Sequence, residues 1–143
     1  MVFKVLPIYK RLGVVLSIFI GIVFLGYVYF VFNPTQYSFF LSCPFKSLTG
    51  YHCAGCGSQR AIHQLLHGEF YKAFRLNPFM VVSLPLVFYG LGTLLYNYIF
   101  QKTHRVQLFY KPWFIYGYFA VAIIYWIARN IPYAPFIYLA PSE

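Results

Sequence analysis

The chain has 143 residues, of which 61% are hydrophobic and only 9% are charged, so too little polar surface is available to cover a water-soluble globule. Glu69 and Glu143 are the only acidic residues, which excludes a pair of carboxylates for glycoside cleavage and oxygen-rich Mg²⁺ or Ca²⁺ sites. The net charge of +9 is spread beside apolar runs, so we expect the partner to be anionic lipid headgroups and not nucleic acid.

Three uncharged apolar runs predict an all-α membrane protein, folded as one domain, with spans at about residues 12–32, 78–100 and 113–131. The first run is about 30 Å long as a helix, which equals the thickness of the bilayer hydrocarbon. Asn77 is expected to cap the second helix, because Pro78 suits a first helical position. The third run is short, and we expect Arg129 to extend it by reaching toward the headgroups.

The basic residues predict how the spans are oriented. They are dense before the first run and between the second and third runs, and sparse in the long segment 33–77. The positive-inside rule therefore predicts a cytoplasmic N-terminus and an external segment 33–77. Gly13, Ser17 and Gly21 form a stripe of small residues on the first helix. We expect it to pack against another helix, which belongs either to the same chain, the alternative we favour, or to another copy of the chain.

Segment 33–77 holds all three cysteines, and their spacing allows three interpretations. Cys53 and Cys56 can both reach one Zn²⁺ ion, with Cys43 as the third thiolate and His52 as a fourth ligand. Alternatively, Cys-Ala-Gly-Cys before a helix is typical of a redox-active thiol pair. The third interpretation is a disulfide or packed free thiols, in a tight turn whose positive φ angles are supplied by Gly50, Gly55 and Gly57.

Two short amphipathic helices are predicted after the cysteines, lying in the membrane interface or folded back over the bundle. The first covers residues 60–67 and is expected to end at Gly68, and the second starts near Glu69. Arg60 on the first helix, and Arg129 at the end of the third span, are candidates for binding a phosphate headgroup or a carboxylate. His63 and His67 lie one turn apart, and they suit either a metal ion or the polar side of an interfacial helix.

The order of cysteines, glycines and the Asn-Pro pair resembles the bacterial membrane-protein family catalogued as domain of unknown function 2752. The resemblance covers about residues 40–80 well and the last 15 residues loosely, and it implies a small protein of the cell inner membrane without an assigned activity. It therefore supports a topology and a site, and it contributes no reaction. The matching residues are Cys43, Pro44, Gly50, Cys53, Gly55, Cys56, Gly57, Arg60, Ala61, Gly68, Glu69, Asn77 and Pro78.

These features favour a non-enzymatic membrane protein that docks a partner or binds a ligand. Cys43, Cys53 and Cys56 are expected to act as one structural unit, as a thiol cluster or a zinc site, that fixes the loop to the helix beginning near Ser58. The partners expected are other membrane proteins or further copies of the chain. Two alternatives stay open: a membrane thiol oxidoreductase that uses Cys53 and Cys56, and a subunit of a small oligomeric transporter.

Overall fold

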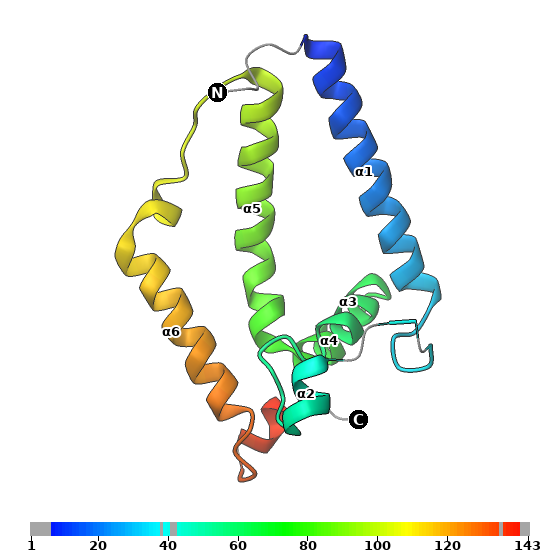
Figure 1. The fold of residues 1–143 in the computed structure, drawn as a ribbon, viewed down its shortest axis with the longest axis vertical. Coiled ribbons are helices and arrows are strands. Elements are labelled where there is room, and N and C mark those ends of the chain that lie inside the picture. The colour runs from blue at the N-terminus through cyan, green and yellow to red at the C-terminus, as the bar shows by residue number, and fades with distance from the viewer. Residues whose placement is uncertain (1–6, 38, 41–42, 135, 141–143) are drawn as a thin grey trace.

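The computed structural model describes residues 7–37, 39–40, 43–134 and 136–140, and this part of the chain is helical without any strand (Figure 1). The all-α fold class is therefore confirmed. Its elements in chain order are α1 (Ile8–Val31), α2 (Pro44–Thr49), α3 (Ser58–Leu66), α4 (Phe70–Leu76), α5 (Pro78–Phe100), the 3₁₀ helix η2 (Gln107–Tyr110), α6 (Pro112–Ala128) and the 3₁₀ helix η3 (Phe136–Leu139).

Two of the described helices are long and apolar enough to cross a membrane. They are α1, with 24 residues, and α5, with 23 residues, and each exceeds the hydrocarbon thickness of about 30 Å. The third apolar helix, α6, has 17 residues and a length of about 26 Å. It ends at Ala128 and not near residue 131 as expected, because Arg129 and Asn130 turn toward the cysteine segment.

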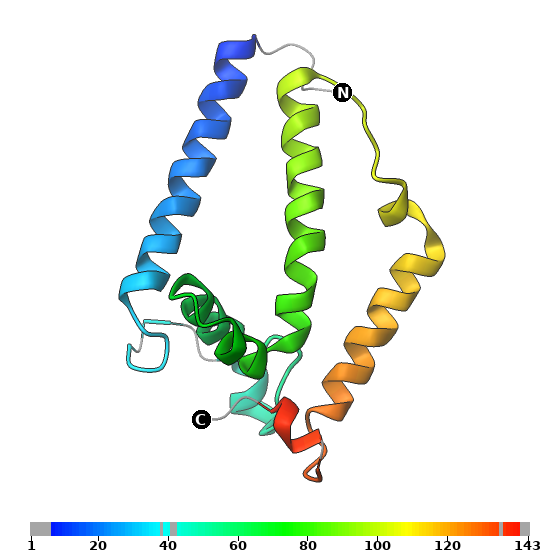
Figure 2. The same cartoon turned by 180° about the vertical axis from the view of Figure 1, so that it is seen from behind.

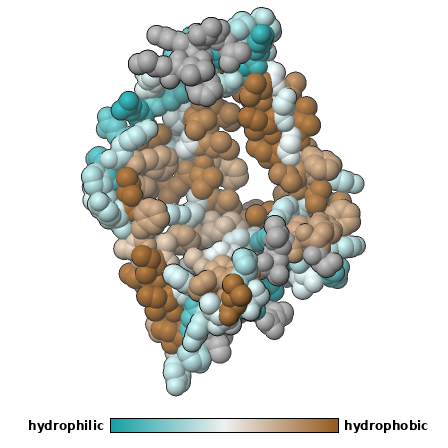
Figure 3. Space-filling model, in the orientation of Figure 1, coloured by the Kyte–Doolittle hydropathy of each residue, from teal (hydrophilic) through white to brown (hydrophobic). Residues whose placement is uncertain are grey.

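Each of the helices α1 and α6 comes close to α5 at one end of the molecule and diverges from it toward the other end (Figures 1 and 2). α1 approaches α5 where α1 begins and α5 ends, and there the buried Arg11 donates to the carbonyl of Ile99 at 3.3 Å. α6 approaches α5 at the opposite end, beside α2, α4 and η3. Hydrophobic surface runs along the helices, and hydrophilic residues gather toward the two ends of the molecule (Figure 3).

The small-residue stripe on α1 does not pack as expected. No described atom lies within 4 Å of a Cβ placed on Gly13 or Gly21, and the hydroxyl of Ser17 donates to its own helix at the carbonyl of Gly13. The expectation of packing within the chain is wrong, because α1 diverges from α5 beyond Arg11.

The short helices α3 and α4 form a hairpin that is attached to the end of α1. The turn between them contains Gly68 at φ 77°, a left-handed conformation that costs glycine little. His63 Nδ1 donates to the carbonyl of Tyr29 at 2.6 Å, and the ring of His67 stacks on Phe30. The histidine side of α3 therefore faces α1. Beyond the predicted elements, the described chain forms α2 and the two 3₁₀ helices η2 and η3.

Replacing His63 by leucine should weaken this attachment. The substitution removes the hydrogen bond to Tyr29, and we expect the free energy of unfolding to fall by about 1 kcal/mol. His104→Leu is the control, since His104 bonds to Asn97 through its backbone atoms. Denaturation in mild detergent measures both variants, and equal stability of the two would show that the hydrogen bond contributes nothing.

Candidate metal centre

The three cysteine sulfurs converge at one point between α2 and α3. Cys53 Sγ lies 3.2 Å from Cys43 Sγ and 3.2 Å from Cys56 Sγ, and the three sulfur atoms all lie within 4.8 Å of one another. All three are free thiols; Cys43 and Cys53 are half-buried, and Cys56 is 7% exposed. The expected clustering of the cysteines is therefore confirmed, and the arrangement can bind a metal ion.

Local backbone geometry brings the sulfurs together. Cys43 immediately precedes α2, and Gly50 ends this helix in the left-handed conformation at φ 76°, which returns the chain toward Cys43. Gly57, at φ 84°, makes the corresponding turn before α3, and side chains resist both conformations. Gly55 has no positive φ, so the expectation for this glycine is wrong, and a Cβ there would make only an ordinary contact with Cys53 Sγ at 3.9 Å.

The side chain of Arg129 binds the backbone of the turn between Cys53 and Cys56. Its Nη1 donates to the carbonyls of Cys53 at 3.1 Å and Ala54 at 3.2 Å, and its Nη2 donates to the carbonyl of Cys56 at 3.1 Å. Only 1% of the residue is exposed, and the guanidinium lies over the ring of Tyr125 at 5.1 Å. The expectation that Arg129 reaches toward a headgroup or a carboxylate is wrong, because both terminal nitrogens of its guanidinium donate to carbonyls of the turn, while its buried Nε has no hydrogen-bond partner among the described residues.

Asn77 is a second polar link between the same turn and the long helices. Its Oδ1 accepts from the backbone N–H of Met80 at 3.0 Å, which is the expected cap of α5, and from the hydroxyl of Tyr125. Its Nδ2 donates to the carbonyl of Ala54 at 3.0 Å and to Ser58 Oγ at 2.9 Å. With 1% of its surface exposed, Asn77 joins α3, α5 and α6 at one buried point.

The residue before the turn is fixed through its backbone. His52 N–H donates to Asn130 Oδ1 at 2.8 Å, while the carbonyl of His52 accepts from Asn130 Nδ2 and Trp126 Nε1, both at 2.9 Å. Among the described residues, the metal-binding group consists of the three sulfurs, and no histidine belongs to it. His63 and His67 lie against α1, and Arg60 is half-buried in the first turn of α3.

The charges around the turn are unusual, because a buried cation lies here without a carboxylate. Arg129 stays protonated at any physiological pH. Glu69, the acidic residue that the described chain contains, pairs with Lys72 at 3.1 Å on the surface, and Glu143 lies outside the described residues. The dipole at the end of α6 offsets part of the positive charge. The thiols of the cluster are the remaining groups able to supply a full negative charge.

The thiols differ in how readily they ionise. Burial opposes ionisation of Cys43, but hydrogen bonds from the backbone of Lys46 and from Cys53 outweigh it, so the pKa of Cys43 is lowered. Burial, together with the neighbouring Cys53 sulfur, raises the pKa of Cys56 to about 12. Without a metal, Cys43 therefore ionises more readily than Cys56.

Comparison with known proteins finds a family match over part of the chain and no activity. The sequence model of the family described as "Protein of unknown function (DUF2752)" matches residues 43–91, so the resemblance expected from the cysteine pattern is confirmed over that range. No curated protein and no solved structure matches the chain. The matched range contains the three cysteines and Asn77, but it stops before Trp126 of α6 and before Arg129 and Asn130, which follow that helix.

Part of the centre was not predictable from sequence patterns. Asn77 was recognised as a helix cap, but its bonds to the cysteine turn were missed, as were the contributions of Tyr125, Trp126 and Asn130. The aromatic residues resemble those of any membrane-interface belt. The one signal in the sequence was the Arg-Asn pair at the end of an apolar run, followed by Pro132.

Lysine should not replace Arg129, because its three N–H donors share one nitrogen, whereas the planar guanidinium reaches the three carbonyls from two separate nitrogens. We expect Arg129→Lys to lower the free energy of unfolding by about 2 kcal/mol, and Arg129→Gln, which also removes the charge, to lower it further. Arg75→Lys at the exposed end of α4 is the matched control. Thermal denaturation in detergent is the measurement, and an Arg129→Lys variant as stable as the control would contradict this role.

The thiols should react in a fixed order in reduced, chelator-treated protein. At pH 7–8 Cys43 has the larger thiolate fraction and the greater exposure, so we expect an alkylating reagent to modify it well before Cys56. Mass spectrometry of peptides from a time course reads this order directly. Denatured protein, in which both rates should become similar, is the control, and faster modification of Cys56 in the folded protein would refute the assignment.

Proposed function

We propose that this protein is a multi-pass membrane protein whose three cysteines bind one Zn²⁺ ion, forming a rigid site that docks a partner or a ligand. The observation that carries the proposal is the convergence of three sulfurs on a turn whose carbonyls are held by a buried arginine. A turn fixed in this way presents its thiols in one arrangement, which lowers the entropic cost of metal binding.

The sulfur geometry suits zinc. Tetrahedral Zn²⁺ with bonds of about 2.3 Å holds its sulfur ligands about 3.8 Å apart. The separations here begin at 3.2 Å and stay within 4.8 Å, so small side-chain rotations suffice to reach that value. The three sulfurs leave the fourth coordination position to water or to a group from a partner, as at sites that bind a ligand.

The charge balance also favours a metal-bound trithiolate. Three thiolates and one Zn²⁺ carry a net charge of −1, which matches the single positive charge of the buried Arg129. The proton of Cys56 must leave when the metal binds. Zinc affinity should therefore rise with pH across the neutral range.

We infer that α1, α5 and α6 all cross the bilayer of a bacterial inner membrane. The length of α6, about 26 Å, is a few ångströms short of the hydrocarbon, a mismatch that slight bilayer thinning accommodates. The basic start of α1 and the beginning of the basic loop 101–111 lie at one end of the molecule, the loop then runs beside α5 to η2, and the cysteine segment lies at the other end (Figure 1). The positive-inside rule then supports a cytoplasmic N-terminus and an external cysteine segment.

A docking role is supported by an apolar hollow beside the cysteine turn. It has a volume of about 390 Å³, and its wall combines residues of α2, of the end of α6 and of the segments that follow these helices, namely Phe45, Tyr51, Trp126, Ile127, Asn130 and Ile131. Asn130 and Trp126 also hold His52, so the hollow and the metal site share the same supports. Another membrane protein or a second copy of this chain is the class of partner that such a surface fits.

A second candidate function is thiol–disulfide exchange, favoured by the 3.2 Å separation of Cys53 Sγ and Cys56 Sγ. In that case the two thiols would form a disulfide and pass two electrons and two protons to a disulfide of a partner protein, which becomes two thiols. An external location of the segment is compatible with this chemistry.

Metal content and thiol content together separate the two functions. Protein purified without chelator or reductant should contain about one zinc per chain, and the triple Cys→Ser variant should contain none. One free thiol per chain without metal would instead support thiol–disulfide exchange. Three freely titrating thiols without metal, together with unaltered stability of the triple variant, would contradict both proposed functions. Cys43→Ser alone should reduce zinc affinity yet leave a Cys53–Cys56 disulfide possible.

A further inference from the structure

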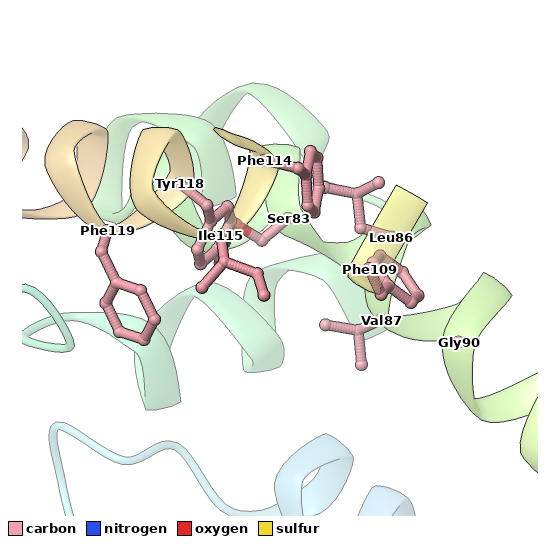
Figure 4. A pocket seen from close by; sticks show the side chains of 9 residues that line it. All are labelled: Ser83, Leu86, Val87, Gly90, Phe109, Phe114, Ile115, Tyr118 and Phe119. Carbon is pink, nitrogen blue, oxygen red and sulfur yellow. Dashed lines mark hydrogen bonds between the residues drawn. The ribbon is translucent and has the colours of Figure 1, made fainter. Parts of the chain in front are cut away.

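A second candidate site lies between α5 and α6, away from the cysteine turn. It is a cavity of about 350 Å³ whose lining comes from α5, η2 and α6 and is almost entirely apolar (Figure 4). Its polar groups are the hydroxyls of Ser83 and Tyr118, which bond to each other at 2.9 Å, and Ser83 also donates to the carbonyl of Phe79. Since these hydroxyls are already partnered, the cavity favours a hydrocarbon chain and not a polar molecule.

The apolar cavity adjoins a polar one toward the end of α5. The second cavity has a volume of about 450 Å³ and is lined in part by Asn97, His104 and Arg105. The two cavities share Gly90 and Phe109. A Cβ on Gly90 would lie 2.9 Å from the Phe109 ring, so glycine allows that ring to pack closely across α5 at the junction.

Together the two cavities, which we call the groove, place an apolar part and a more polar part along α5, as the acyl chain and headgroup of one phospholipid require. Ser83 and Asn97 are separated by about 21 Å along α5, compared with about 15 Å for half of the bilayer hydrocarbon and about 5–8 Å more for the adjoining headgroup region. The loop 101–111 that borders the polar end contains Lys102, Arg105 and Lys111 and no acidic residue. Arg105 lies over the ring of Tyr110 at 5.7 Å, which positions its guanidinium beside this end of the groove.

We propose that this groove binds one anionic phospholipid, with an acyl chain in the apolar cavity and the phosphate headgroup at Arg105. The charge of the loop selects an anionic headgroup over a zwitterionic one, because each nearby basic residue attracts anionic lipid. The proposal depends on the inferred placement of α5 and α6 in the bilayer and is independent of the zinc site. The more polar cavity lies toward the end of α5, on the inferred cytoplasmic side, whereas the cysteine turn bonds to Asn77 at the start of α5.

Native mass spectrometry tests the site on the full chain, purified in mild detergent with equal amounts of phosphatidylglycerol and phosphatidylcholine of the same acyl chains. The wild type should retain one phospholipid, with phosphatidylglycerol preferred about fivefold or more. Arg105→Gln should lower that preference about fivefold, and Val87→Trp, which fills the apolar cavity, should abolish retention of both lipids. Lys72→Gln removes a positive charge on α4, far from the groove, and should change neither.

Three results would overturn the proposal: no headgroup preference in the wild type, an unchanged preference in Arg105→Gln, or full retention by Val87→Trp, which would mean annular lipid only. Should Val87→Trp fail to fold, the preference of Arg105→Gln decides the matter, because Arg105 is exposed in a loop. Zinc measured on the same samples keeps the two proposals apart. Lipid loss with unchanged zinc counts against the groove alone, and zinc loss with retained lipid counts against the cysteine site alone.

Discussion

The structure depends above all on the hydrogen bonds between one buried arginine and the backbone of one turn. Arg129 leaves the end of α6 and donates to three carbonyls between Cys53 and Cys56, so a residue late in the chain fixes the shape of a loop more than 70 residues earlier. Asn77 binds the same turn from the start of α5. Without these donors the carbonyls of Ala54 and Cys56 would lose their side-chain partners, and a buried carbonyl left unsatisfied costs more than its hydrogen bond contributes.

The same arginine sets the electrostatic character of the site. A buried cation needs a negative partner, and in a chain with two acidic residues the cysteines are the groups available to provide it. The pKa of Cys43 is lowered and the pKa of Cys56 is raised, so without a metal Cys43 ionises more readily than Cys56. A bound Zn²⁺ would let all three sulfurs ionise while the centre as a whole stays close to neutral. Arg129 thus accounts both for the hydrogen bonds to the turn's carbonyls and for the charge balance of the site.

Sequence reasoning succeeded where the signal is local. Uncharged runs predicted α1 and α5, the Asn77-Pro78 pair predicted the start of α5, and Gly50 and Gly57 predicted left-handed turns, because length, capping and backbone freedom each depend on adjacent residues. Sequence reasoning failed where a side chain's role depends on residues far away in the chain. Arg129 was expected to reach solvent or an anion, since an arginine at the end of an apolar helix usually does so. The carbonyls that bind Arg129 lie in another part of the chain, and no periodic pattern in the sequence indicates them. The packing of Gly13 and Gly21 was mispredicted for the same reason: a stripe shows that close approach is possible, not which helix approaches.

The central claim is that the three sulfurs bind one metal ion together, and X-ray absorption at the zinc edge tests it most directly. For zinc-loaded protein in lipid nanodiscs, the account predicts three sulfur neighbours at about 2.3 Å and one lighter neighbour at about 2.0–2.1 Å. The Arg129→Gln variant should show fewer sulfur neighbours, because the turn is no longer held. A shell of nitrogen and oxygen atoms with no more than one sulfur in the wild type would contradict the account.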